Sequence, residues 1–110
     1  MDTRTDTAPL PTVPALAAMI DHAVLKPTQV ERDVVEACTV ARREHIASVC
    51  VKPFYVPDCS RLLQGSGVRT STVVGFPHGG QASEVKVATS LQALRDGATE
   101  LDMVINIGAL

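Results

Sequence analysis

The sequence LDMVINIGAL, from Leu101 to Leu110, places one acidic residue inside an apolar run that is typical of a β-strand. Alternate residues of a strand face opposite sides, so Asp102 shares one face with Val104 and Asn106, and the residues between them form an apolar face. A carboxylate that is buried without a partner is costly. We therefore expect Asp102 to have a function, and its pKa should be raised if it is buried without a cation.

Three further β-type runs alternate with helical patterns along the chain. The predicted strands are IDHAVL (20–25), IASVCV (46–51), VRTSTVV (68–74) and ELDMVI (100–105), and the helical patterns are KPTQVERDVVEACTVARREH (26–45), PDCSRLLQG (57–65) and SEVKVATSLQALRDGA (83–98). The connections are short, so this order predicts a mainly parallel sheet with right-handed crossovers. For the helix starts, Thr28 and Glu31 match a T-x-x-E capping box, and Ser83 is the expected N-cap of the last helix.

The polar residues of the strands distinguish two kinds of parallel sheet. A central strand of a doubly wound sheet meets helices on both faces and should be apolar throughout, whereas one strand face of a (β/α) barrel lines the interior. Asp21 shares a face with Ala23, and Ser48 shares one with Cys50 and Lys52. This pattern favours a barrel interior and weighs against a small flavodoxin-like binding domain.

The chain supplies about three and a half of the eight βα units of such a barrel. We therefore expect an α/β fold in which residues 14–110 form part of a (β/α)8 TIM barrel with parallel strands. Residues 1–13 are rich in proline and threonine and are predicted to be a flexible tail.

Composition limits the classes of partner. The 110 residues carry a net charge of −2, so there is no basic excess for nucleic acid or an anionic membrane, and no apolar run reaches the length of a membrane span. The N-terminus lacks an apolar signal sequence. The number of cysteines, three, is odd, and the sequence has no CxxC motif. This predicts reduced thiols in a cytoplasm. The three histidines and three cysteines show no metal-ligand spacing, so we expect no metal and no cofactor.

Four segments together resemble the deoxyribose-phosphate aldolase family. They are IDHAVLKPT (20–28), SVCVKPFYVP (48–57), TVVGFPHGG (72–80) and ELDMVINIGAL (100–110). The resemblance implies a class I aldolase that cleaves 2-deoxyribose 5-phosphate to glyceraldehyde 3-phosphate and acetaldehyde without a metal. In this family a lysine forms a Schiff base, a second lysine depresses its pKa, and an aspartate and a water relay the proton.

The resemblance also implies roles for three residues of this chain. Asp102 matches the catalytic proton-relay aspartate, and Asp21 and Cys50 match residues of the substrate pocket. Two positions depart from the relatives: Ala23 stands where most have threonine, and Lys52 stands where asparagine is frequent. The family's lysines and phosphate loops lie in its second half, so we expect the 110-residue chain to be a fragment that is inactive by itself.

The complete enzyme would bind a small phosphorylated sugar and could form a homo-oligomer. The alternative is a non-catalytic half-barrel that self-associates through its open strand edges. Lys52, on the face of Cys50, is the first lysine to consider as a nucleophile within the chain, although lysines such as Lys52 and Lys86 are usually solvated. His78 lies in the loop GFPHGG (75–80), whose glycines favour a tight turn over a phosphate site.

Overall fold

A computed structural model describes residues 8–110 of the chain. Its elements are α1 (Val13–Ala17), β1 (Asp21–Val24), α2 (Glu31–Glu44), β2 (Ser48–Val51), the 3-10 helix η1 (Pro53–Tyr55), α3 (Val56–Leu63), β3 (Arg69–Val74), α4 (Ser83–Arg95), β4 (Glu100–Met103) and the 3-10 helix η2 (Ile107–Ala109). The predicted tail lies partly outside the described residues, and residues 8–12 form no helix or strand. No helix in the described part of the chain is long and apolar enough to cross a membrane.

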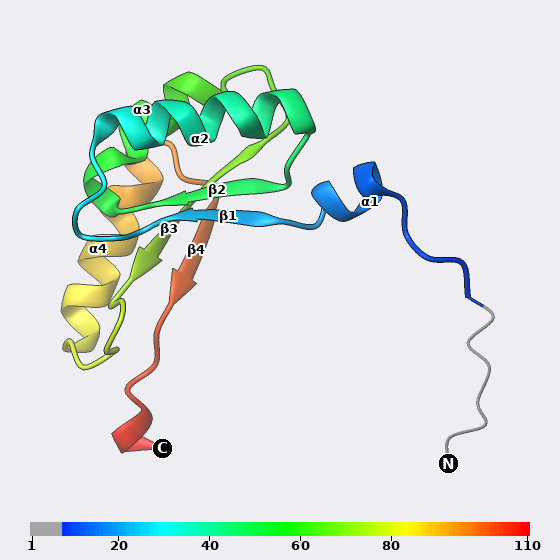
Figure 1. The fold of residues 1–110 in the computed structure, drawn as a ribbon. Helices are drawn as coiled ribbons and strands as arrows, with labels where there is room; N and C mark the ends of the chain where they lie inside the picture. The colour runs from blue at the N-terminus through cyan, green and yellow to red at the C-terminus, as the bar shows by residue number, and fades with distance from the viewer. Residues whose placement is uncertain (1–7) are drawn as a thin grey trace, which may run out of the picture.

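The four strands form one parallel sheet in the order β1-β2-β3-β4, as predicted. Each strand lies beside the one that precedes it in the chain, so the strand order never reverses as it does in a doubly wound sheet. Figure 1 shows the curved sheet with α2 and α3 over it and α4 beside β3. A curved sheet of consecutive parallel strands, with helices against one face, is the arrangement of part of a (β/α) barrel.

The core lies between the helices and one face of the sheet. It is aliphatic, as the scarcity of aromatic residues requires, and its fully buried side chains include Val24, Val34, Val49, Val51 and Val56. Valine suits the strand positions Val24, Val49 and Val51 because its branched side chain packs well on a pleated sheet.

Two cysteines belong to this core, as packing residues. Cys38 of α2 and Cys59 of α3 are buried, with their sulfur atoms 3.8 Å apart. The hydrogen bond between the two thiols, together with burial, holds the pKa of Cys38 well above its ordinary value. Both thiols are free.

The predicted starts of two helices are wrong by one or more residues. Helix α2 begins at Glu31, after a turn in which the Gln29 N–H donates to the carbonyl of Lys26, so Thr28 does not cap it. The capping carboxylate belongs to Asp33, which accepts from the N–H of Val30 at 2.7 Å. Helix α4 begins at Ser83, which was expected to be its N-cap. The N-cap is instead Ala82, which makes no side-chain hydrogen bond to the helix.

The glycine-rich loop before α4 makes a tight turn, as expected. Gly75 and Gly79 both have positive φ, and the N–H of Gly79 donates to the carbonyl of Gly75 at 2.6 Å. Lys86 of α4 was expected to be solvated, but it is half-buried and its ammonium donates to the carbonyl of Gly79 at 2.7 Å. The lysine therefore fastens the loop to the helix that follows it.

Candidate functional site

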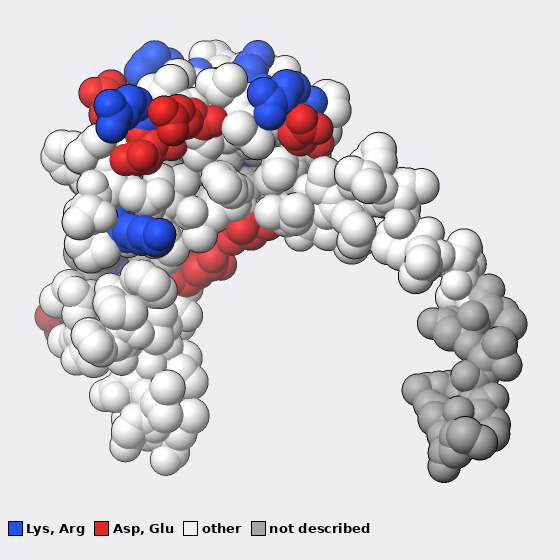
Figure 2. Space-filling view, in the orientation of Figure 1, with Lys and Arg blue, Asp and Glu red and all other residues white. Residues whose placement is uncertain are grey.

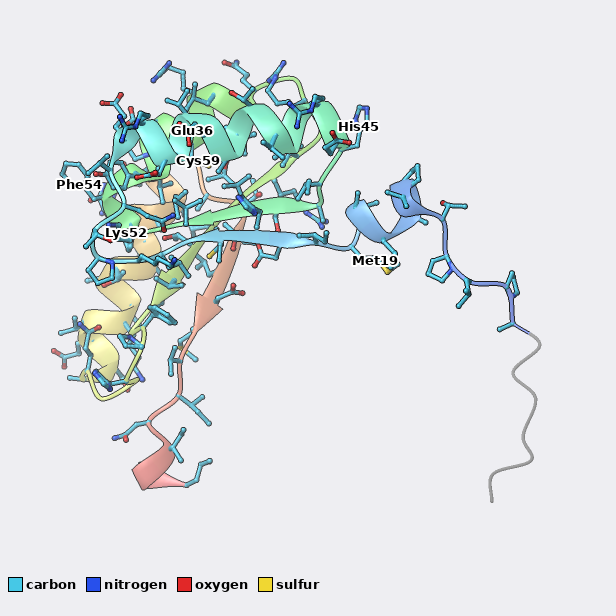
Figure 3. All side chains as sticks on the ribbon, in the orientation of Figure 1. Met19, Glu36, His45, Lys52, Phe54 and Cys59 are labelled. Atoms are coloured by element: carbon cyan, nitrogen blue, oxygen red, sulfur yellow. The ribbon has the colours of Figure 1, made fainter. Side chains whose placement is uncertain are left out.

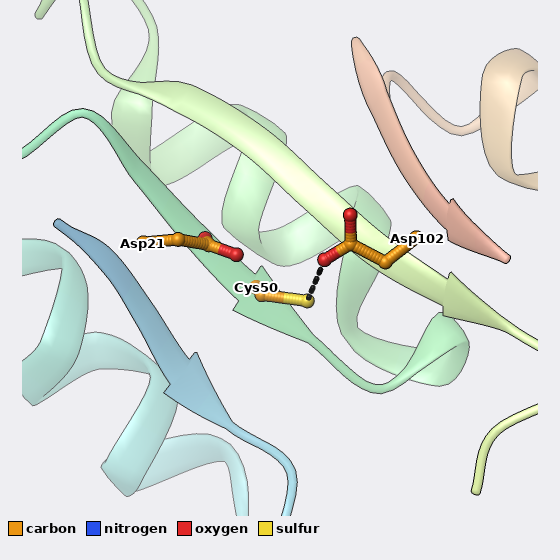
Figure 4. Close-up of side chains that lie close together, drawn as sticks. All are labelled: Asp21, Cys50 and Asp102. Atoms are coloured by element: carbon orange, nitrogen blue, oxygen red, sulfur yellow. Dashed lines mark hydrogen bonds between the residues drawn. The ribbon is translucent and has the colours of Figure 1, made fainter. Parts of the chain in front are cut away.

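Three side chains from three strands meet on the face of the sheet that carries no helix. Asp21 comes from β1, Cys50 from β2 and Asp102 from β4, and one ligand atom from each lies within 4.8 Å of the others. We call these residues the Asp–Cys–Asp cluster (Figure 4). Acidic side chains gather on this hollow side of the sheet in the space-filling view (Figure 2). The structure thus brings together all three residues that the sequence singled out.

Hydrogen bonds connect the cluster to the sheet. The hydroxyl of Ser48 donates to Asp21 Oδ1 at 2.6 Å, and the thiol of Cys50 donates to Asp102 Oδ2 at 3.9 Å. Ser71 is paired in register with Cys50 and is fully buried, and its hydroxyl faces the Cys50 thiol. The sequence did not identify Ser71, because polar residues occur on both faces of β3.

Asp102 is exposed, so the argument from the cost of burying a carboxylate without a partner does not apply to it. The residue lies on β4, an edge strand of the described sheet, and its partner in register on β3 is Val73. Water reaches it because nothing in the described chain covers this face of β4. The polar residue inside an apolar run therefore reflects a sheet whose two faces differ, with packing on one side only.

The pKa of the Cys50 thiol is raised from 9.0 to about 11, mainly by burial and also by the two nearby carboxylates, against a lowering by the hydrogen bond of Ser71. The folded chain therefore keeps this proton in a pH range where the unfolded chain releases it. It follows that this thiol contributes stability below about pH 9, and that the contribution is lost as the pH rises from 9 towards 11.

We expect the rate at which iodoacetamide alkylates Cys50 to keep rising between pH 9 and pH 11 in the folded chain, because only the thiolate reacts. In urea the rate should level off near pH 9. Peptide mass spectrometry assigns the label to each cysteine. A plateau near pH 9 in the folded chain as well would show that the thiol has an ordinary pKa.

Lys52, expected to be solvated, is instead bound to backbone carbonyls. Its ammonium donates to the carbonyls of Lys26 at 3.0 Å, Pro27 at 3.4 Å and Gln29 at 2.9 Å, and lies 5.6 Å from the centre of the Tyr55 ring. It therefore holds the loop after β1 against the end of β2, beside Phe54 (Figure 3).

An open cleft of about 860 Å³ lies at this carboxyl end of the strands. Its lining is mainly apolar and includes Ala23, Leu25, Phe54, Val73 and Phe76. Two of these residues border the Asp–Cys–Asp cluster, since Ala23 pairs in register with Cys50 and Val73 with Asp102. His78 is exposed and does not line the cleft. In barrel enzymes this end of the sheet carries the active site.

Comparison with known proteins identifies the family. The model of the DeoC/LacD family aldolases matches residues 15–110, which is nearly the whole described chain. The chain belongs to the DeoC/LacD aldolase family. This match confirms the resemblance that the four sequence segments indicated.

Curated relatives of the chain are named deoxyribose-phosphate aldolases. That of Desulfitobacterium hafniense is 47% identical over 93 residues, which is 84% of this chain and 43% of the relative. That of Clostridium tetani is 50% identical over 91 residues, which is 83% of this chain and 42% of the relative. The chain thus spans about two fifths of the length of these relatives.

Solved structures agree with the sequence relatives. A putative deoxyribose-phosphate aldolase from Coccidioides immitis superposes with a TM-score of 0.87 at 36% identity, over 92% of this chain and 40% of that one. The deoxyribose phosphate aldolase from Aeropyrum pernix, described as a unique tetramer, gives 0.84 at 33% identity, over 89% of this chain and 42% of that one. The fold is therefore part of the barrel of these aldolases.

Proposed function

We propose that the chain forms the first part of a deoxyribose-phosphate aldolase and supplies one side of its active site. The observation that carries this proposal is the meeting of Asp21, Cys50 and Asp102 on the helix-free face of the sheet, beside a cleft at the carboxyl ends of the strands. The reaction would be the cleavage of 2-deoxyribose 5-phosphate to glyceraldehyde 3-phosphate and acetaldehyde.

In this proposal Asp102 relays a proton through water to the carbon next to the Schiff base. Its exposure supports the role, because a proton relay needs water within reach. Asp21 and Cys50 form the wall of the pocket. Ala23 leaves that wall without the hydroxyl that the family resemblance implies, so a hydrogen bond to the substrate would be missing there.

The nucleophilic lysine of the reaction would lie outside these 110 residues. A Schiff-base lysine must lose its proton at working pH, and this needs an apolar or cationic environment. Lys52 and Lys86 instead donate hydrogen bonds to backbone carbonyls of neighbouring loops, which ties each ammonium to the protein and away from a substrate. We therefore propose that the chain is inactive by itself.

A chimera tests this proposal. Residues 15–110 would replace the matching segment of the Desulfitobacterium hafniense relative, which supplies the remaining part of the barrel. Because the chain is 47% identical over the matched residues, we expect the chimera to fold and to cleave 2-deoxyribose 5-phosphate. A folded chimera without this activity would contradict the proposal.

A second candidate function rests on the sheet edges. β1 pairs only with β2 and β4 only with β3 among the described strands, and unpaired edges are templates for association. An open groove of about 750 Å³, lined partly by the exposed side chains of Leu91, Met103 and Ile105, lies beside β4. The chain would then act as a self-associating half-barrel, and the tetramer described for the Aeropyrum pernix aldolase makes a homo-oligomer a reasonable proposal for the complete enzyme as well.

For this second function we expect size-exclusion chromatography with light scattering to show a discrete dimer of the 110-residue chain. A monomer at all concentrations would contradict it. The three free thiols fit a reducing compartment, so we place either form of the protein in the cytoplasm.

A further inference from the structure

We propose that Lys52 is a positioning residue, whose ammonium holds the loop after β1 as a fixed wall of the cleft and thereby raises the affinity of the cleft for its substrate. The inference rests on the proposed aldolase function, because it concerns the same site. It assigns Lys52 no contact with the reacting atoms. Lys52 acts instead through residues 26–29, which we call the β1 loop.

The β1 loop is a turn whose carbonyl oxygens converge on one cation. The N–H of Gln29 donates to the carbonyl of Lys26 at 3.0 Å, and the side-chain oxygen of Gln29 accepts from the N–H of Lys26 at 3.0 Å. The closed turn directs the carbonyls of Lys26, Pro27 and Gln29 at the ammonium of Lys52, at 3.0, 3.4 and 2.9 Å. An ammonium has three donors, so the β1 loop accepts all that Lys52 offers.

The other end of this contact is anchored in the core. Lys52 follows the fully buried Val51 of β2, and its own carbonyl accepts from the N–H of Tyr55 at 2.9 Å (Figure 3). The Tyr55 ring packs against the hydrophobic core, and its centre lies 5.6 Å from the ammonium, where a ring attracts a cation. The ammonium therefore ties the β1 loop, whose side chains are mostly exposed, to a rigid part of the protein.

Both ends of the contact lie along the cleft at the carboxyl ends of the strands. The lining comes from three neighbouring segments, which are Leu25 with the β1 loop, Lys52 with Pro53 and Phe54, and Phe76 with Pro77 after β3. A wall that moves must be ordered whenever substrate binds, and this cost lowers affinity. A β1 loop that is already fixed avoids the cost, so releasing it should weaken substrate binding.

The contact consists of hydrogen bonds to the backbone. None of the ion pairs within residues 8–110 involves Lys52, and its side chain is half-buried. Salt screens exposed charges strongly and partly buried contacts much less. The effect of Lys52 on affinity should therefore be nearly independent of ionic strength, unlike a long-range attraction between the ammonium and a phosphorylated substrate.

Lys52→Met in the chimera tests the inference. Methionine keeps an unbranched side chain and removes the three donors. We expect the KM for 2-deoxyribose 5-phosphate to rise about tenfold and kcat to change by less than about twofold, because the wall binds substrate and transition state alike. The ratio of the two KM values should be the same at low and at high salt. A ratio that falls to one at high salt would overturn the inference, because it would show attraction through space.

Arg42→Met is the matched control. Arg42 of α2 also donates to two backbone carbonyls, those of Leu62 and Gln64, each at 3.1 Å, and it does not line the cleft. The substitution removes the same charge and the same kind of contact at the end of α3, so the KM should stay unchanged. Equal KM values for the folded Lys52 and Arg42 variants would overturn the inference.

Hydrogen exchange on the 110-residue chain separates this inference from the proposed function. Lys52→Met should speed the exchange of the Gln29 amide by about tenfold, because the turn opens more often, and Arg42→Met should leave it unchanged. The amides of β2 serve as the internal reference, and circular dichroism confirms that each variant is folded. An inactive chimera would contradict the proposed function alone. Unchanged exchange of Gln29 in the Lys52 variant would overturn the inference whether or not the chimera is active.

Discussion

Replacing Asp102 by asparagine in the chimera should lower kcat by roughly 10²- to 10⁴-fold, the usual contribution of a positioned general acid or base. Asparagine keeps the size of the side chain but cannot accept and return a proton. The residue is exposed on β4, and asparagine still offers an oxygen to the Cys50 thiol, so the fold should be unaffected. Steady-state cleavage of 2-deoxyribose 5-phosphate measures the loss, and the KM should change much less than kcat because the group acts mainly in the transition state.

Asp58→Asn is the matched control for this prediction. Asp58 lies on α3, on the helix side of the sheet, and its only described ion pair is the surface contact with Arg61. The control variant should keep the kcat of the chimera. Equal activity of the Asp102 and Asp58 variants would remove the relay role from Asp102, even if the chimera itself is an active aldolase.

Replacing Gly79 by alanine should destabilise the 110-residue chain by about 2–4 kcal/mol, because a left-handed backbone and a backbone clash act together. Gly79 has a φ of +70°, where a side chain is strained. Its Cβ would overlap the carbonyl oxygen of Ile105 and lie 2.9 Å from Val104 Cγ1. The clash would push apart the loop after β3 and the segment after β4.

Gly80→Ala provides the control next to this position. A Cβ on Gly80 meets no atom within 4 Å, and its φ is not positive. We expect urea unfolding to show a lower midpoint for Gly79→Ala and an unchanged or slightly higher midpoint for Gly80→Ala. Equal midpoints would mean that the loop does not approach the end of β4 as closely as the structure shows.

The two faces of each strand were predictable from the sequence because they depend on local alternation. Asp21, Cys50 and Asp102 each share a strand face with small or polar residues, and the parallel register of the sheet places these faces on one side. Helix-facing positions such as Val49 and Val51 are aliphatic for the same reason, and both are fully buried.

The remaining features depend on contacts between distant segments, which no local pattern encodes. Lys52 reaches carbonyls that lie 23 to 26 residues away, so its sequence context indicated only a solvated lysine. Asp102 is 52 residues from Cys50, so no local pattern in the sequence shows that these two side chains meet. The start of α2 was misassigned because residues 26–29 form a separate turn, so the N-cap is Val30 and not Thr28.

Trapping with acetaldehyde and borohydride tests the central claim most directly, because reduction fixes any Schiff base as a mass increase on one lysine. The 110-residue chain and the chimera would be treated in parallel, and the intact masses and labelled peptides compared. We predict no adduct on the folded 110-residue chain and a single adduct on the chimera, outside residues 15–110. A stoichiometric adduct on Lys26, Lys52 or Lys86 would show that the chain carries its own nucleophile and would contradict the claim that it supplies only the relay side of the site.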